Sequence, residues 1–286
     1  MPARLHHERI ARSDQSPTRW LVLTHGIYGA GSNWRSIARK VTDQRREWGV
    51  VLVDLRGHGR SEAGEPPHTV AACAEDVRAL IETLGETLGD VRAIAGHSFG
   101  GKVALATRRL VALDQTWVLD ASPSARRVLP ERPVEQATTG AAATGHGEST
   151  VLQVLELMER APRTWARRED FVAAVTREGH EAGLAQWLAM SLIPDGAGQL
   201  VLRFDLAALR EMIGDYRATD LWDVLEAPGG DVEVVVAERS PTLSAADRGR
   251  LAAAPPHVHV HYVPAGHWLH IDAPAAVVEL LVARLP

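Results

Sequence analysis

Short apolar runs alternate with amphipathic stretches in the first and last parts of this 286-residue chain. The apolar runs lie at residues 20–23, 50–53, 91–95, 116–119, 232–237 and 258–263. The amphipathic stretches lie at residues 34–46, 70–84, 103–113, 245–254 and 273–285. Continuous apolar strands that alternate with helices are typical of a mostly parallel sheet buried on both faces. The pattern therefore predicts an α/β fold, and residues 4–11 are expected to add an antiparallel edge strand.

The alternation stops between residues 122 and 224, where apolar positions recur at helical spacing instead. One predicted helical face carries Val151, Leu152, Val154, Leu155 and Met158, and another carries Leu184, Trp187, Leu188 and Leu192. We therefore expect one α/β core built from residues 1–121 and 225–286, interrupted by a helical cap or lid at residues 122–224. Residues 137–150 are small and glycine-rich, which predicts a loop or lid hinge.

A serine lies among closely spaced glycines where an apolar run meets a predicted helix. The sequence Gly96-His97-Ser98-Phe99-Gly100-Gly101 directly follows the run at 91–95. This arrangement is typical of a nucleophile elbow, a sharp strand-to-helix turn that exposes the serine hydroxyl. Small residues are needed because strand and helix come close together at such a turn. Ser98 is therefore the candidate nucleophile, and the backbone N–H of Phe99 is a candidate oxyanion donor.

A serine hydroxyl needs a base that takes its proton and returns it to the leaving group. Of the thirteen histidines, His267 is the best candidate, because it follows the last predicted strand in a glycine-initiated loop. His25 and His58 lie in glycine turns and are expected to brace loops. A trio alternates along one predicted strand without an acidic residue or cysteine at zinc-like spacing: His257, His259 and His261. The sequence predicts neither a metal site nor a cofactor.

The motifs and their order resemble the α/β-hydrolase superfamily, and within it the small serine esterases and acyl-thioesterases of the YbfF type. Four segments carry the resemblance to that branch: 96–102, 118–123, 203–206 and 266–270. The resemblance implies an α/β-hydrolase fold, with a mostly parallel central sheet flanked by helices and an inserted helical cap. It also implies a second oxyanion donor in the loop His25-Gly26-Ile27, and the backbone N–H of Ile27 is the favoured group.

The acid of the predicted triad has two candidates. Most members of the superfamily place it after the penultimate strand, but that loop here reads Ala237-Glu238-Arg239-Ser240, with serine at the usual aspartate position. Asp120, at the end of the run 116–119, matches the position used in the YbfF-type branch. We favour Asp120 as the partner of His267, with Glu238 as the alternative.

Composition narrows the class of protein. A net charge of −5 and a pI of about 6.2 do not indicate the clustered basic surface that binding of nucleic acid requires. No apolar stretch approaches the roughly 20 residues of a membrane span, and the polar N-terminus does not resemble a signal peptide. Cys73 is the single cysteine, so an intramolecular disulfide is excluded and we expect a buried helical thiol. These features predict a cytoplasmic protein.

The predicted activity is hydrolysis of carboxylic esters or thioesters with small to medium acyl groups, through an acyl-enzyme on Ser98. The expected partner is a small-molecule ester or thioester. The same triad also serves C–C bond hydrolysis, lactone opening and perhydrolysis, and a binding protein on a hydrolase scaffold is a further alternative. The sequence identifies neither the acyl chain, nor the leaving group, nor the oligomeric state.

Overall fold

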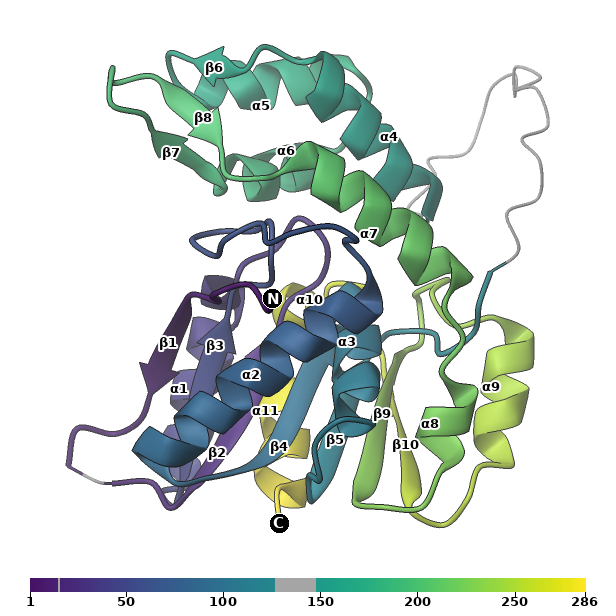
Figure 1. Ribbon diagram of the computed structural model, residues 1–286. Helices are drawn as coiled ribbons and strands as arrows, with labels where there is room; N and C mark the ends of the chain where they lie inside the picture. The colour runs from purple at the N-terminus through teal and green to yellow at the C-terminus, as the bar shows by residue number, and fades with distance from the viewer. Residues whose placement is uncertain (15, 127–147) are drawn as a thin grey trace.

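A seven-stranded sheet forms the core of the computed structural model, which describes residues 1–14, 16–126 and 148–286 (Figure 1). The spatial order is β1 (His7–Ile10), β3 (Trp48–Val53), β2 (Arg19–Thr24), β4 (Asp90–His97), β5 (Gln115–Leu119), β9 (Asp231–Ala237) and β10 (Val258–Val263). All neighbouring pairs are parallel except β1 with β3, which is antiparallel. The predicted parallel sheet and its antiparallel edge strand are thus confirmed.

Helices cover both faces of this sheet, because alternate residues of each strand point to opposite sides. On β2, Trp20 and Val22 belong to one hydrophobic cluster, whereas Leu21 and Leu23 belong to the other. The first cluster includes side chains of α2 (Val70–Leu88), α3 (Phe99–Arg108), α8 (Trp222–Glu226) and α9 (Ala245–Ala252). The second includes side chains of η1 (Gly31–Trp34), α1 (Arg35–Gln44), α10 (Leu269–Asp272) and α11 (Pro274–Arg284).

The amphipathic stretches of the core are confirmed as helices, but α3 begins earlier than its apolar pattern indicates. It starts at Phe99, before the predicted residue 103. Gly100 and Gly101 carry no side chain that could extend the helical pattern. Cys73 is buried within α2 as expected, and burial raises the pKa of its thiol. None of the helices that the structure describes has both the length and the apolar character of a membrane span.

The inserted region lies over one end of the sheet (Figure 1). Its described elements are α4 (Glu148–Arg160), β6 (Thr164–Trp165), α5 (Arg168–Arg177), α6 (Ala182–Ala189), β7 (Leu192–Pro194), β8 (Leu200–Leu202) and α7 (Leu206–Ala218). Residues 137–147 of the predicted loop lie outside the described part, and its last three residues belong to α4. Residues 122–224 remain the proposed extent of the cap.

A small antiparallel sheet in the cap, with strand order β6-β8-β7, corrects the expectation of helices alone. Leu192, which we assigned to a helical face with Leu184, begins β7 after α6 has ended at Ala189. Strands of two or three residues are too short to display a period-2 pattern. An apolar residue close to a helix end therefore fits either periodicity.

Lys102 joins the cap to the core. Its side chain is buried, and Nζ donates hydrogen bonds to the backbone oxygens of Ser124 (2.9 Å), Tyr216 (2.6 Å) and Thr219 (2.6 Å). Ser124 lies where the chain leaves β5, whereas Tyr216 and Thr219 lie at the end of α7. The helix that starts after Ser98 is therefore tied to both connections of the cap.

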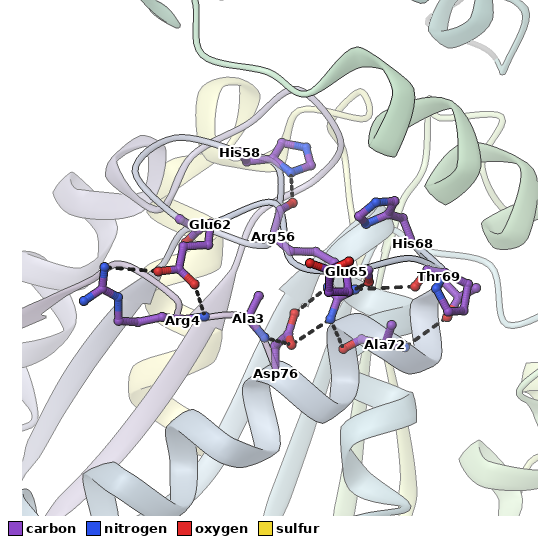
Figure 2. Close-up of polar contacts among 12 residues, drawn as sticks. Ala3, Arg4, Arg56, His58, Glu62, Glu65, His68, Thr69, Ala72 and Asp76 are labelled. Atoms are coloured by element: carbon purple, nitrogen blue, oxygen red, sulfur yellow. Dashed lines mark hydrogen bonds and ion pairs between the residues drawn. The ribbon is translucent and has the colours of Figure 1, made fainter. Parts of the chain in front are cut away.

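A second polar network fixes the turn that follows β3 (Figure 2). The Arg56 guanidinium and the Asp76 carboxylate form a buried ion pair with contacts of 2.6 and 2.8 Å. The same carboxylate accepts the backbone N–H of Ala3 at 2.6 Å, and His58 Nδ1 donates to the Arg56 oxygen at 2.9 Å. Because these groups are buried and paired, they hold the turn in one conformation.

Candidate active site

Ser98 occupies the turn between β4 and α3, with φ 54° and ψ −117°. This backbone is unfavourable for a residue with a side chain, and such strain clusters at functional sites. The Ser98 N–H donates to the Leu119 oxygen of the neighbouring strand at 3.0 Å. A Cβ on Gly96 would lie only 1.9 Å from the Gly100 oxygen, so glycine is required where strand and helix meet.

His267 lies between the serine and a buried carboxylate. Its Nε2 is 3.0 Å from Ser98 Oγ, and its Nδ1 is 2.6 Å from Asp120 Oδ2. Asp120 is fully buried, and its Oδ1 accepts the backbone N–H of Ala237 at 3.1 Å. Glu238, the alternative acid, is exposed just beyond the end of β9. The structure therefore brings Ser98, His267 and Asp120 together and leaves Glu238 apart from them.

Two further histidines lie near the base, and one of them, His97, is hydrogen-bonded to it. His97 Nε2 donates to the backbone oxygen of His267 at 2.7 Å, and the two rings lie 4.8 Å apart. Burial lowers the pKa of His97 well below its usual value, so this ring stays neutral. Burial, followed by the proximity of His267, lowers the pKa of His270 to about 4. Neither neighbour therefore places a positive charge beside His267 near neutral pH.

Thr242 is a site residue that the sequence analysis missed. Its Oγ1 lies 3.0 Å from His267 Nδ1 and accepts a hydrogen bond from Ser240 Oγ at 2.9 Å. Both residues lie in the loop after β9, where the commoner superfamily pattern places the acid. The Nδ1 proton of His267 therefore faces the Asp120 carboxylate and the Thr242 hydroxyl together. The serine at the usual aspartate position is the one feature of the sequence that points to a hydroxyl near His267. It does not indicate which nearby hydroxyl contacts the imidazole.

Replacing Thr242 with valine is expected to lower kcat about five- to tenfold, because one hydrogen bond worth about 1 kcal/mol is lost from the imidazole. Steady-state kinetics on a short ester would measure this effect. Thr242→Ser keeps the hydroxyl and is the matched control, expected to retain most of the activity. Equal rates for the valine variant and the unaltered protein would show that the contact has no part in turnover.

The two predicted oxyanion donors lie next to the serine. Phe99 is the first residue of α3, so its N–H has no acceptor within the helix. Ile27 belongs to the loop after β2, and a Cβ on Gly26 would lie 3.1 Å from Ser98 Cβ, so this loop closely approaches the nucleophile. His25 braces the loop, because its Nδ1 donates to the Gly26 oxygen at 2.7 Å. The roles of Ile27 and Phe99 as donors remain predictions.

A cavity of about 180 Å³ opens at Ser98. Its cap side is mainly apolar, with Val151, Val154, Leu184, Trp187 and Ile213, and also includes Tyr216 and Arg217 of α7. Tyr28 forms part of the wall, and its hydroxyl donates to the Val151 oxygen at 2.7 Å. Burial of apolar surface is the main source of affinity for a hydrocarbon group. This cavity therefore suits an apolar group.

The three strand histidines do not gather around a common point. His261 Nε2 lies 2.5 Å from Glu233 Oε2, and His257 Nε2 donates to the Leu225 oxygen at 3.3 Å. His259 Nε2 is 3.6 Å from Asp231 Oδ1. Within residues 1–14, 16–126 and 148–286, no group of three or more histidine, cysteine or acidic side chains is arranged to hold a metal ion.

The fold and the Ser98–His267–Asp120 arrangement are those of an α/β hydrolase. The chain belongs to the alpha/beta hydrolase family, whose model matches residues 21–280. It is 27% identical to the esterase YbfF of Escherichia coli over 270 residues, which is 91% of each chain. It is 26% identical to the sn-1-specific diacylglycerol lipase ABHD11 of Danio rerio over 280 residues, covering 96% of this chain and 80% of the relative.

A solved structure with a similar fold is a marine microorganism esterase, with a TM-score of 0.77 and 20% identity. The match covers 98% of this chain and 99% of that protein. Together, the family match and the relatives identify a hydrolase that resembles the YbfF-type branch.

Proposed function

We propose that the protein is a serine hydrolase that cleaves carboxylic esters or thioesters of small to medium acyl groups. The observation that carries this proposal is the position of His267, whose two ring nitrogens lie within hydrogen-bond distance of Ser98 and Asp120. A neutral imidazole with its proton on Nδ1 leaves Nε2 free to accept the serine proton. The buried carboxylate selects that tautomer and stabilises the imidazolium that follows.

The reaction proceeds in two halves. Ser98 Oγ attacks the carbonyl carbon while its proton passes to His267 Nε2, and the N–H groups of Phe99 and Ile27 stabilise the oxyanion. The carbon–oxygen or carbon–sulfur bond then breaks as His267 returns the proton to the leaving group. A water molecule attacks the acyl-enzyme by the same route, releasing the acid and regenerating Ser98.

The names of the relatives favour acyl transfer to water, because one relative is called an esterase and the other a lipase. The apolar cavity at Ser98 agrees with an acyl substrate. C–C bond hydrolysis, lactone opening and perhydrolysis use the same triad and are the rival reactions. A binding protein on this scaffold would require an unreactive Ser98, although its hydroxyl contacts the imidazole.

Labelling with a fluorophosphonate probe tests the proposal, since only an activated serine reacts. We expect one modified residue, Ser98, identified by peptide mass spectrometry. Ser36→Ala, which removes an exposed serine of α1, is the matched control and should label normally. A panel of 4-nitrophenyl esters and acyl-CoA thioesters of graded length would then define the acyl preference. Absence of labelling would overturn the proposal, and labelling with turnover only of a 1,3-diketone would favour C–C hydrolysis.

A further inference from the structure

A second cavity, of about 530 Å³, adjoins the catalytic cavity. Three residues line both cavities, namely Tyr28, Asn33 and Trp187, so the two cavities are adjacent. The core side of the second cavity comes from β1, the loop after β2 and the turn after β3, and its cap side comes from the segment after α6 and from Arg203 beyond β8. A ligand that fills it would contact both the core and the cap.

The charges in the second cavity are unbalanced. Both carboxylates that line the cavity already have hydrogen-bond donors. The Glu8 carboxylate accepts hydrogen bonds from Arg35 Nε at 2.9 Å and Arg35 Nη2 at 2.5 Å. Asp54 accepts the backbone N–H groups of Gly31 at 2.8 Å and Arg60 at 2.9 Å. Burial lowers the pKa of His7, another residue that lines the cavity, and keeps it neutral. The acidic groups are therefore engaged, and the surplus charge is positive.

This surplus resides on two arginines from opposite walls. Neither the Arg60 nor the Arg203 guanidinium forms an ion pair or a hydrogen bond with the described residues of the chain. Arg60 follows the turn that the Arg56–Asp76 pair stabilises. Arg203 is half-buried, and its backbone N–H is held by the Ser191 oxygen at 3.1 Å. Both positions are thus anchored through the backbone. Arg203 is half-buried and Arg60 is exposed, and both residues line the cavity.

We propose that this cavity is an anion-binding subsite, in which Arg60 and Arg203 hold a carboxylate or phosphate group on the leaving group of the substrate. A guanidinium presents planar N–H donors that match the oxygens of either anion. The catalytic cavity is mainly apolar, and the two arginines that also line it, Arg126 and Arg217, have interaction partners. It therefore suits the acyl chain, and the polar neighbouring cavity is left for the other half of the ester. The inference rests on the proposed esterase function, and it specifies the substrate class as an ester or thioester with an anionic leaving group.

Matched acetate esters test this subsite. 4-Acetoxybenzoate and its methyl ester differ in one charge on the leaving group, and 4-acetoxyphenyl phosphate supplies the phosphate arm. We expect the unaltered protein to have a higher kcat/KM for the charged esters, mainly through a lower KM. Arg203→Gln or Arg60→Gln should reduce the ratio of charged to neutral kcat/KM about tenfold, since charge-assisted hydrogen bonds are the strong ones. The preference should also shrink as salt is added.

Arg177→Gln is the matched control, because it removes an exposed positive charge from α5 without altering the cavity. A ratio that is the same in all variants would overturn the subsite. So would a preference that instead follows a carboxylate on the acyl side, tested with 4-nitrophenyl hemisuccinate. Binding of 4-acetoxybenzoate and its methyl ester to the Ser98→Ala protein, measured by calorimetry, separates the two proposals. If no ester is hydrolysed but only the charged ester binds, and Arg203→Gln abolishes that binding, the esterase function fails while the subsite stands.

Discussion

Replacing Ser98 with alanine is expected to abolish ester hydrolysis and leave the fold intact. The change removes the nucleophile but only one small oxygen atom, and Ser98 makes its structural contacts through its backbone N–H and oxygen. Removal of a triad serine lowers kcat by about 10⁶-fold in a well-studied serine protease. Single-turnover kinetics on a 4-nitrophenyl ester would measure the loss, with circular dichroism and a thermal melt to verify the fold.

The companion variant His267→Ala makes this prediction more specific. Because serine and histidine act as one unit, the double variant should be no slower than either single variant. Losses that multiply would indicate two independent contributions and contradict a shared proton transfer. Substantial residual activity in a folded Ser98→Ala protein would show that another group is the nucleophile.

The sequence predicts those parts of the fold in which a local pattern of residues is compatible with a single local structure. The run at 50–53 and the second half of the run at 91–95 are apolar because their strands are buried there on both faces, so they stand out without tertiary information. The nucleophile elbow can be recognised from the sequence equally well, because only glycine fits where the Gly96 backbone meets the Gly100 oxygen. Strand order along the chain then locates His267.

The features that the sequence did not reveal depend on residues that meet only in the folded chain. Thr242 contacts His267 because the loop after β9 curves toward the last strand, and nothing local in its sequence predicts that curvature. The second cavity is lined by Arg60 from the core and Arg203 from the cap. Nothing in the sequence around either arginine indicates that the two lie near each other in the folded chain. The choice between Asp120 and Glu238 likewise depended on which carboxylate reaches the imidazole.

Replacing Asp120 with asparagine is expected to reduce kcat by about 10⁴-fold, the loss seen for the same change in serine proteases. Asp120 has φ 44°, a left-handed backbone that asparagine tolerates well, so the exchange should preserve the turn. The side chain must still accept the Ala237 N–H at its first oxygen position. The amide oxygen satisfies that contact, which turns the NH₂ group toward His267 Nδ1.

That orientation explains why the loss should be large. An NH₂ donor facing Nδ1 favours the tautomer with its proton on Nε2, and this nitrogen then cannot accept the proton of Ser98. Glu238→Gln is the matched control: it alters an exposed loop carboxylate and should leave kcat within about twofold, as is usual for surface changes. Steady-state kinetics on one short ester compares the two variants directly. If the glutamine variant lost activity and the asparagine variant kept it, Glu238 would be the acid and Asp120 a structural residue of the turn.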